Sequence, residues 1–285
     1  MQRRKRREKE VNILRSAAYW RPIRAVAIPV FRKINVGDIT IRHHWTGDAV
    51  ALHSFKHKDY WFHGKHREQR SMESTARLLH PGDTVFDIGG HIGYMALYFG
   101  HLVGPTGRVH TFEPGPNNLP YIRRNIRTSK YGNVTLSEQA VGCSDGVVSM
   151  WIEDLTGENN SMIPAYRVLA ANTRSHHTKP NVLEVQVSCV SVDDFVRQES
   201  VCPDFVKIDV EGAELDVLNG MQDTLNQIRP VLLIEVTHRH ADVLRVLNRA
   251  QYSVFDDGLH PILESNYLGG NIFALPAGTV AVAGS

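Results

Sequence analysis

The chain has 285 residues, 42% hydrophobic and 22% charged, which is enough to bury the core of one large α/β domain with a small appendage. Its 32 Lys and Arg residues nearly balance its 30 Asp and Glu residues, for a formal net charge of +2. Because the charges balance, the surface as a whole has no positive electrostatic field that would attract polyanions, and no nucleic-acid partner is expected. The three cysteines, Cys143, Cys189 and Cys202, lack CxxC spacing, which argues against a disulfide framework or structural zinc and favours a reducing cytoplasm.

Basic charge is concentrated near the N-terminus, where "RRKRRE" occupies residues 3–8. The apolar segments that follow are short and interrupted by arginines, so neither a secretion signal nor a membrane span is predicted. We expect residues 1–30 to form a solvated arm, with transient contact to an acidic membrane or partner as the alternative. Residues 33–63 alternate apolar and polar positions around Gly37-Asp38 and Gly47-Asp48, which predicts a hairpin or small meander. We therefore expect residues 1–70 to be an extension packed on a main domain of residues 71–285.

The main domain is predicted to alternate strands and helices after a short helix at residues 71–80. Strands are expected at "TVFDI", "RVHTFEP", "NVTLSEQAVG", "FVKIDV" and "PVLLIEV", with helices between most of them, which indicates a parallel, doubly wound sheet. "VVSMWIED" and "VLEVQVSCVSV" are predicted as extra strands that enclose a long polar segment. "YSVFDD" and "NIFALP" are joined by a loop, which predicts that an antiparallel edge strand closes the sheet.

The turn after the first of these strands is rich in glycine. Strand one ends near Asp87, and Gly89, Gly90 and Gly93 lead into a helix. The dinucleotide fingerprint G-x-G-x-x-G needs a second glycine two residues after the first, and this turn fails that test. Asp87 would repel a pyrophosphate but suits an ammonium group or hydroxyls. The turn therefore favours a cofactor with an amino-acid end over a nicotinamide nucleotide.

The second strand also ends in an acid. Glu113 lies 20 residues after Gly93, where a carboxylate can accept both hydroxyls of a ribose, and Pro114 ends the strand so that the acid stays at its tip. An acid with a glycine-rich turn, followed by an acid at the end of the next strand, is the arrangement that binds S-adenosylmethionine (AdoMet).

The blocks "VFDIGGHIGY", "TFEPGPNNLPYIRRNI", "AVGCSDG", "VSVDDFV" and "FVKIDVEGAELDVLNGM" followed by "RPVLLIEV" together resemble an FkbM-family methyltransferase over roughly residues 72–256. The resemblance implies a Rossmann-like class I methyltransferase that uses AdoMet to methylate hydroxyl groups of sugars or polyketide-type products. It also implies these cofactor-binding residues: Asp87, Gly89, Gly90, His91, Gly93, Glu113, Pro114 and Ala140. The family's usual Ala-Asn in the turn is Gly90-His91 here, and His91 either hydrogen-bonds the amino-acid end of the cofactor or only lies exposed.

Transfer of a methyl group to oxygen requires removal of a proton from the acceptor, by a base or with the help of a metal. In "KIDVEG", Lys207 and Asp209 share one face of a strand and Glu211 follows at the turn; in "IEVTHRH", Glu235 and His238 reach the same rim. One of Asp209, Glu211, Glu235 and His238 is the expected general base, with neighbouring acids raising its pKa.

Two alternatives remain open for these acids. Asp209, Glu211 and Glu235 or His238 would suit Mg²⁺ or Mn²⁺ better than zinc, although a divalent cation is not favoured. The acids can also be structural, stabilised at the first turn of the next helix. We expect this structural role for Glu214 and a functional role for Asp209.

The polar segment 154–181 is too long to be a passive connection. We expect a lid or an acceptor-binding loop, with Asn159, Asn160 and Ser161 facing a small-molecule or glycan acceptor, or otherwise a disordered surface loop. After it, Ser191 and Asp194 have the spacing of a capping box that begins a helix. Two other functions compete with methyl transfer: an NAD(P)-dependent Rossmann oxidoreductase, and a non-catalytic module that only binds AdoMet.

Overall fold

A computed structural model describes residues 36–153, 160–163, 181–262 and 269–279. The expected basic arm, residues 1–30, lies outside the described residues, as does most of the polar segment 154–181. Among the helices of the described ranges, none is long and apolar enough to cross a membrane.

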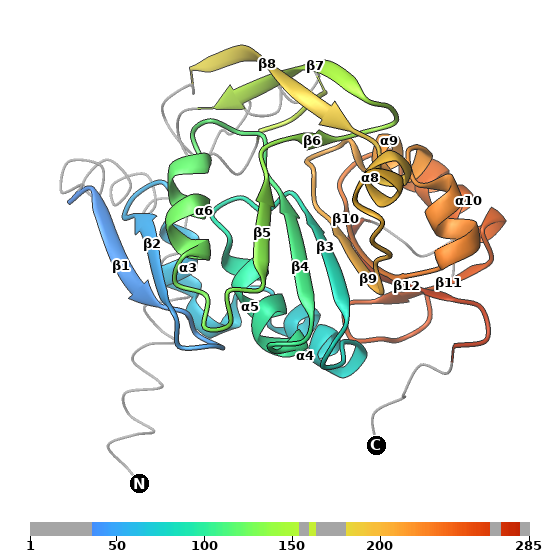
Figure 1. The fold of residues 1–285 in the computed structure, drawn as a ribbon, viewed down its shortest axis with the longest axis horizontal. Helices are drawn as coiled ribbons and strands as arrows, with labels where there is room; N and C mark the ends of the chain where they lie inside the picture. The colour runs from blue at the N-terminus through green and yellow to red at the C-terminus, as the bar shows by residue number, and fades with distance from the viewer. Residues whose placement is uncertain (1–35, 154–159, 164–180, 263–268, 280–285) are drawn as a thin grey trace, which may run out of the picture.

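A seven-stranded sheet forms the centre of the molecule, in the spatial order β11-β12-β10-β9-β3-β4-β5 (Figure 1). Strands β3, β4, β5, β9 and β10 pair in parallel, so the α/β, doubly wound and mostly parallel sheet is as predicted. The chain runs outward from β3 to β5 and then returns to β9 on the other side of β3, so the order reverses between β3 and β9. Ligands of such sheets bind beyond the carboxyl ends of the strands at this reversal. The strands are β3 Thr84–Ile88, β4 Arg108–Phe112, β5 Val134–Ser137, β9 Phe205–Ile208, β10 Val231–Val236, β11 Tyr252–Asp256 and β12 Gly270–Pro276.

The sheet ends in an antiparallel edge strand, as predicted. β12 pairs with β10 on one side and with β11 on the other, antiparallel to both. Its residues Ile272, Phe273, Ala274 and Leu275 are all fully buried, as an interior strand requires. The edge position belongs to β11, where only Tyr252 is buried.

Helices cover both faces of the sheet and create two apolar cores. One face carries α8 Val192–Glu199, α9 Glu214–Asn219, a π-helical turn η2 Thr224–Ile228 and α10 His240–Arg249, and the other carries α4 Gln69–Leu78 and α5 Tyr94–Val103. Beside α5 lies α6 Leu119–Ile126. Because successive side chains of a strand point to opposite faces, Phe86 and Ile88 join the first core while Val85 joins the second.

A second, three-stranded sheet lies across one end of the molecule (Figure 1). It contains β6 Ala140–Val141, β7 Gly146–Glu153 and β8 Val182–Val190, with β8 in the middle. The segment "NVTLSEQAVG", predicted as one strand, is therefore two strands in two sheets. The chain leaves the central sheet at Glu138, whose carboxylate binds Arg123 on the surface, and then pairs with β8.

The N-terminal extension consists of the predicted hairpin and a short helical region. β1 Asp38–Arg42 and β2 Ala49–His53 pair antiparallel, and α3 Lys58–His63 and a 3₁₀ turn η1 Gly64–His66 follow. Val50, Leu52 and Tyr60 are buried in the same core as α5. The amide of Asn125 in α6 exchanges two hydrogen bonds with the backbone of Ala51, at 2.7 and 2.9 Å, so the extension is joined to the main domain by apolar and polar contacts.

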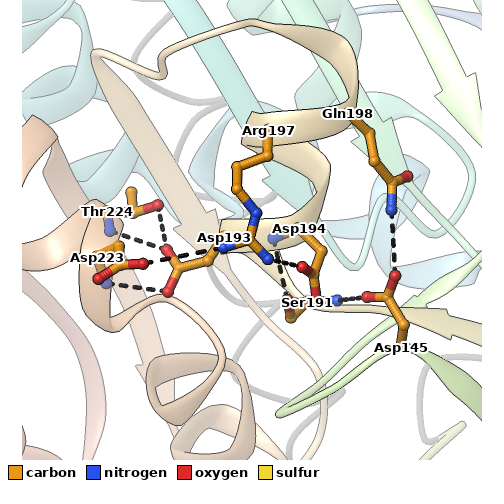
Figure 2. A network of polar contacts seen from close by, with 8 residues as sticks. All are labelled: Asp145, Ser191, Asp193, Asp194, Arg197, Gln198, Asp223 and Thr224. Atoms are coloured by element: carbon orange, nitrogen blue, oxygen red, sulfur yellow. Dashed lines mark hydrogen bonds and ion pairs between the residues drawn. The ribbon is translucent and has the colours of Figure 1, made fainter.

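Helix α8 begins at the predicted capping box. The backbone N–H of Asp194 donates to Ser191 Oγ at 3.1 Å, and Figure 2 shows the polar network around this cap. Asp145, just before β7, accepts from the Ser191 N–H at 2.9 Å, while Asp193 accepts from the backbone N–H of Thr224 at 2.8 Å. The start of α8 thereby connects the second sheet to η2.

Candidate functional site

A cavity of about 270 Å³ lies at the carboxyl ends of the central strands, where the strand order reverses. This volume is near the lower end of the range of about 300–1,000 Å³ typical of small-molecule sites. Most of the residues predicted from the sequence line it: Gly89, Gly90, His91, Glu113, Pro114, Ala140, Asn160, Asp209, Glu211 and Glu235. The fold therefore brings six of the eight expected cofactor residues and three of the four candidate bases to one cavity.

The remaining predicted residues of the described ranges lie elsewhere. Asp87, Gly93 and Ser161 do not line the cavity, whereas Asn159 is outside the described residues. His238 is exposed beyond the end of β10 and does not line the cavity either. The structure therefore does not bring His238 to the cavity beside Glu235, because β10 ends at Val236 and the chain passes through exposed residues before α10.

The glycines of the turn are required by the neighbouring strands. Gly89 has a φ of +84°, and a Cβ there would lie 1.8 Å from the backbone oxygen of Asp209. A Cβ on Gly90 would lie 2.2 Å from Thr111 Oγ1. Both glycines donate their N–H groups to the Phe112 carbonyl, at 3.0 and 2.9 Å. They therefore let β3, β4 and β9 meet closely at the floor of the cavity, in addition to any close approach of a ligand.

Glu113 organises the cofactor side of the cavity. Its carboxylate accepts from the His91 N–H at 2.8 Å, from the Gly115 N–H at 2.8 Å and from Asn118 Nδ2 at 3.2 Å. The side chain is almost completely buried, and burial raises the pKa of Glu113 to about 7 although these donors oppose the rise. A carboxylate offers about four acceptor positions, so this one can take a further hydrogen bond from a ligand.

A buried ammonium group connects the turn to the catalytic candidates. Lys207 Nζ lies 3.4 Å from Asp87 Oδ1 and 3.2 Å from Asp209 Oδ2, and it donates to the Gly89 carbonyl at 3.0 Å. Burial lowers the pKa of Lys207, but the two carboxylates raise it by more, so the group stays charged. Burial also raises the pKa of Asp87, against the opposing effect of Lys207. The strand pattern predicted that Lys207 and Asp209 share one face of a strand, but it predicted no role for Lys207.

Asp209 and Glu235 form the acidic part of the cavity. β9 and β10 pair with Ile208 opposite Ile234, so the next residues, Asp209 and Glu235, follow side by side. The charge of Asp209, then burial, then Glu68 raise the pKa of Glu235 to about 8, while Lys207 opposes the rise. Glu235 therefore binds a proton far more readily than an ordinary glutamate and is suited to take one from a hydroxyl group.

The other two acids of this region have different surroundings. Glu211 lines the cavity with a φ of +51°, and its backbone carbonyl accepts from Ser161 Oγ at 2.6 Å. Glu214 is fully buried outside the cavity wall and accepts from the Gly212 N–H at 2.7 Å and from Thr237 Oγ1 at 3.1 Å. Its carboxylate holds the turn after β9 against the end of β10, which is the structural role expected for it.

The described part of the polar segment belongs to the cavity wall. Ser161 exchanges two backbone hydrogen bonds with Trp151 of β7, at 2.9 and 3.0 Å. Asn160 donates to Asn117 Oδ1 at 2.8 Å, and both Asn160 and Met162 line the cavity. Whether the segment is a lid concerns residues that, for the most part, lie outside the described ranges.

Several lining residues were not predicted. The main group comes from the extension and the start of α4: Tyr60, Arg67, Glu68 and Met72. The local pattern of this segment gave no signal for them, because their place in the cavity depends on how the extension folds over the sheet. In the ranges that the structure describes, no group of three or more His, Cys, Asp or Glu side chains could hold a metal ion.

Comparison with known proteins finds related methyltransferases. A family profile described as "Methyltransferase FkbM domain" matches residues 87–254, more than half of the chain. "31-O-demethyl-FK506 methyltransferase FkbM" of Streptomyces tacrolimicus is 31% identical over 163 residues, which are 51% of this chain and 62% of that protein. "Methyltransferase 1" of Beauveria bassiana is 27% identical, over 50% of this chain and 60% of that protein. The chain thus spans about three fifths of the length of these two relatives.

Two further matches extend over more of the chain. "Hexuronic acid methyltransferase AglP" of Haloferax volcanii is 27% identical over 193 residues, which cover 66% of this chain and 72% of that protein. The crystal structure of methyltransferase FkbM from Methylobacillus flagellatus KT aligns with a TM-score of 0.44 and 19% identity, over 69% of this chain and 44% of that one. On the strength of the profile match, this chain belongs to the FkbM methyltransferase family.

Proposed function

We propose that this protein is an O-methyltransferase that transfers a methyl group from AdoMet to a hydroxyl of a sugar, polyketide or related small molecule. The observation that carries the proposal is that one cavity contains Glu113, a carboxylate suited to accept hydrogen bonds from ribose hydroxyls, together with an acidic pair, Asp209 and Glu235. The names of two relatives, a hexuronic acid methyltransferase and a 31-O-demethyl-FK506 methyltransferase, support a small-molecule acceptor and, in the second case, oxygen as the methylated atom.

The donor set of the cavity fits AdoMet. Glu113 directly follows β4 and has capacity for a hydroxyl, and the apolar side chains of Phe112, Val141 and Met150 line the same cavity, which suits a nucleoside. When bound, AdoMet supplies an electrophilic methyl group on a good leaving group. The residues that would hold it are those of the turn 89–91, Glu113, Asn118 and the segment 139–141.

The chain must then remove a proton from the acceptor hydroxyl, and we assign this step to Glu235. Its raised pKa, due first to Asp209, makes its carboxylate a stronger base than an ordinary glutamate. Lys207 holds Asp209 beside it through the contact at 3.2 Å, so Asp209 contributes negative charge and orientation. Glu211, which also lines the cavity, is the second candidate for the base.

Thermal stabilisation by ligands tests the proposal. A ligand that binds only the folded state raises the free energy of unfolding, by about 2.7 kcal/mol at a hundredfold excess over Kd. We expect AdoMet and its product S-adenosylhomocysteine to raise Tm, and NAD(H) and NADP(H) to leave it unchanged. Stabilisation by a nicotinamide nucleotide alone would overturn the methyltransferase and favour the oxidoreductase. The same series with Mg²⁺ shows whether a cation binds, because the metal alternative requires a further rise that disappears in Asp209→Asn.

A further inference from the structure

The segment between α3 and α4 forms one wall of the cavity. Tyr60, Arg67 and Glu68 line it together with His91 and Glu235. All three residues precede the residues 87–254 that the family profile matches. This wall is therefore a part of the site that lies outside the profile match.

Contacts within the wall hold it in one arrangement. The guanidinium carbon of Arg67 lies 4.1 Å from the centroid of the Tyr60 ring, within the range of a cation–π contact. Arg67 Nε donates to Glu68 Oε1 at 3.0 Å. Glu68 has a left-handed φ of +50° immediately before α4, and the first turn of α4 is fixed to β12 because Asn271 Nδ2 donates to Ser71 Oγ at 3.0 Å.

A hydrogen bond joins this wall to the cofactor turn. The Tyr60 hydroxyl lies 2.9 Å from His91 Nδ1, and the two rings stack with an angle of 23° between their planes. The backbone N–H of His91 donates in turn to Glu113 Oε2. A continuous series of contacts therefore runs from Arg67 through Tyr60 and His91 to the carboxylate that is proposed to bind the ribose.

We propose that Tyr60 is a positioning residue that couples cofactor binding to the ordering of residues 58–68. The inference rests on the proposed function, since it takes Glu113 as a cofactor residue. A ligand on Glu113 restrains the turn that carries His91, and the His91 ring transmits that restraint to Tyr60 and so to Arg67. Cofactor binding then already orders the wall, so that binding of the acceptor costs less conformational entropy.

Hydrogen–deuterium exchange of the full chain, with and without S-adenosylhomocysteine, tests the coupling. In the unmodified protein we expect the ligand to slow exchange in the turn 89–91 and also in residues 58–68. Tyr60→Phe removes only the hydroxyl and keeps the buried ring. It should retain protection of the turn, lose protection of residues 58–68 and bind S-adenosylhomocysteine about three- to tenfold more weakly, the effect of one hydrogen bond. Phe62→Leu, on the exposed side of the same helix, should leave both effects unchanged.

A second variant keeps the inference testable if Tyr60→Phe folds poorly. His91→Asn breaks the same contact from the other side and should by itself lose ligand protection of residues 58–68. Where both single variants fold, the double variant should bind no more weakly than either single one, because both remove one interaction. Ligand protection of the turn alone, intact coupling in Tyr60→Phe, or additive losses in the double variant would each overturn the coupling and leave the proposed function in place. Failure of the unmodified protein to bind S-adenosylhomocysteine would overturn both.

Discussion

The ammonium group of Lys207 pairs with two of the acids at the site. It lies within 3.4 Å of carboxylate oxygens of both Asp87 and Asp209 and is almost completely buried. A buried charge without a partner is strongly destabilising, so Asp87 and Lys207 require each other. Asp209 is different, because its side chain is 29% exposed toward the cavity and can act on a ligand. The same cation thus stabilises the buried acid Asp87 and orients Asp209, the acid that we propose to act on the ligand.

Substitution of Asp209 separates its part in catalysis from cofactor binding. Asp209→Asn should lower the methyl-transfer rate by about 100-fold or more and leave the affinity for S-adenosylhomocysteine within about threefold. The pH at which the remaining rate rises should also move down, because the charge of Asp209 is the largest cause of the raised pKa of Glu235. Initial rates between about pH 5 and pH 9 measure both effects.

Two further variants control this comparison. Glu235→Gln should abolish the rising limb altogether, since it removes the group whose deprotonation the limb reports. Glu199→Gln changes an exposed acid of α8 outside the cavity and should behave like the unmodified protein. Unchanged turnover in Asp209→Asn would remove Asp209 from the mechanism, and turnover lost in all three variants would indicate a general effect on the fold.

Helix α8 is an element whose start depends on one side chain. Ser191 accepts from the Asp194 N–H and also donates to the Asp194 carboxylate at 2.7 Å (Figure 2). Ser191→Ala should lower the free energy of unfolding by about 1 kcal/mol, measured as the midpoint of urea unfolding. Ser191→Thr keeps the acceptor oxygen and should restore most of the loss, whereas Ser188→Ala, at an exposed position of β8, should cost little. Equal losses at Ser188 and Ser191 would contradict this role of the cap.

Sequence patterns predicted the strands and helices that depend on short stretches of the sequence, such as an apolar run or a capping motif. β3, β9 and β10 are apolar runs, each interrupted by one charged residue, because helices cover both faces, and the cap of α8 is a local motif. The order of β11 and β12 was not predictable in this way, because it depends on which strands pair across the fold. For the same reason "NVTLSEQAVG" gave no sign that it divides between two sheets.

The candidate site shows the same division. Asp209, Glu113 and the glycines of the turn follow directly from strands that end at one edge of a parallel sheet. Tyr60 and Arg67 reach the cavity only through the docking of the extension, and their own segment has no periodic pattern that predicts it. His238 was placed at the rim from its distance to β10 along the chain, but position in space depends on the path after Val236. Residues at strand tips and in the turns that follow them were therefore predictable, whereas residues whose place depends on the docking of the extension were not.

At the scale of the whole molecule, buried titratable groups act on folding in two opposite directions. Burial lowers the pKa of His43 to about 4 and that of His57 to about 3, from 6.5. Their contribution to stability is complete above pH 6.5 and is lost as the pH falls through these values. Glu113 and Glu235 have folded-state pKa values raised from 4.5 to about 7 and about 8. Their contribution is complete below pH 4.5 and is lost as the pH rises through the raised values.

The two sets together predict a stability maximum under mildly acidic conditions. Above pH 6.5 the contribution of the histidines is constant, so the free energy of unfolding of the ligand-free protein should fall as the pH rises toward 8, by on the order of 1 kcal/mol per pKa unit traversed, and Tm should fall with it. Below pH 4.5 the histidines dominate and Tm should fall again. Differential scanning calorimetry across this range measures both limbs. Glu235→Gln should flatten the alkaline limb and Glu199→Gln should not; a Tm that rises steadily from pH 5 to pH 8 would show that other groups govern folding, since the raised carboxyl groups require the opposite slope.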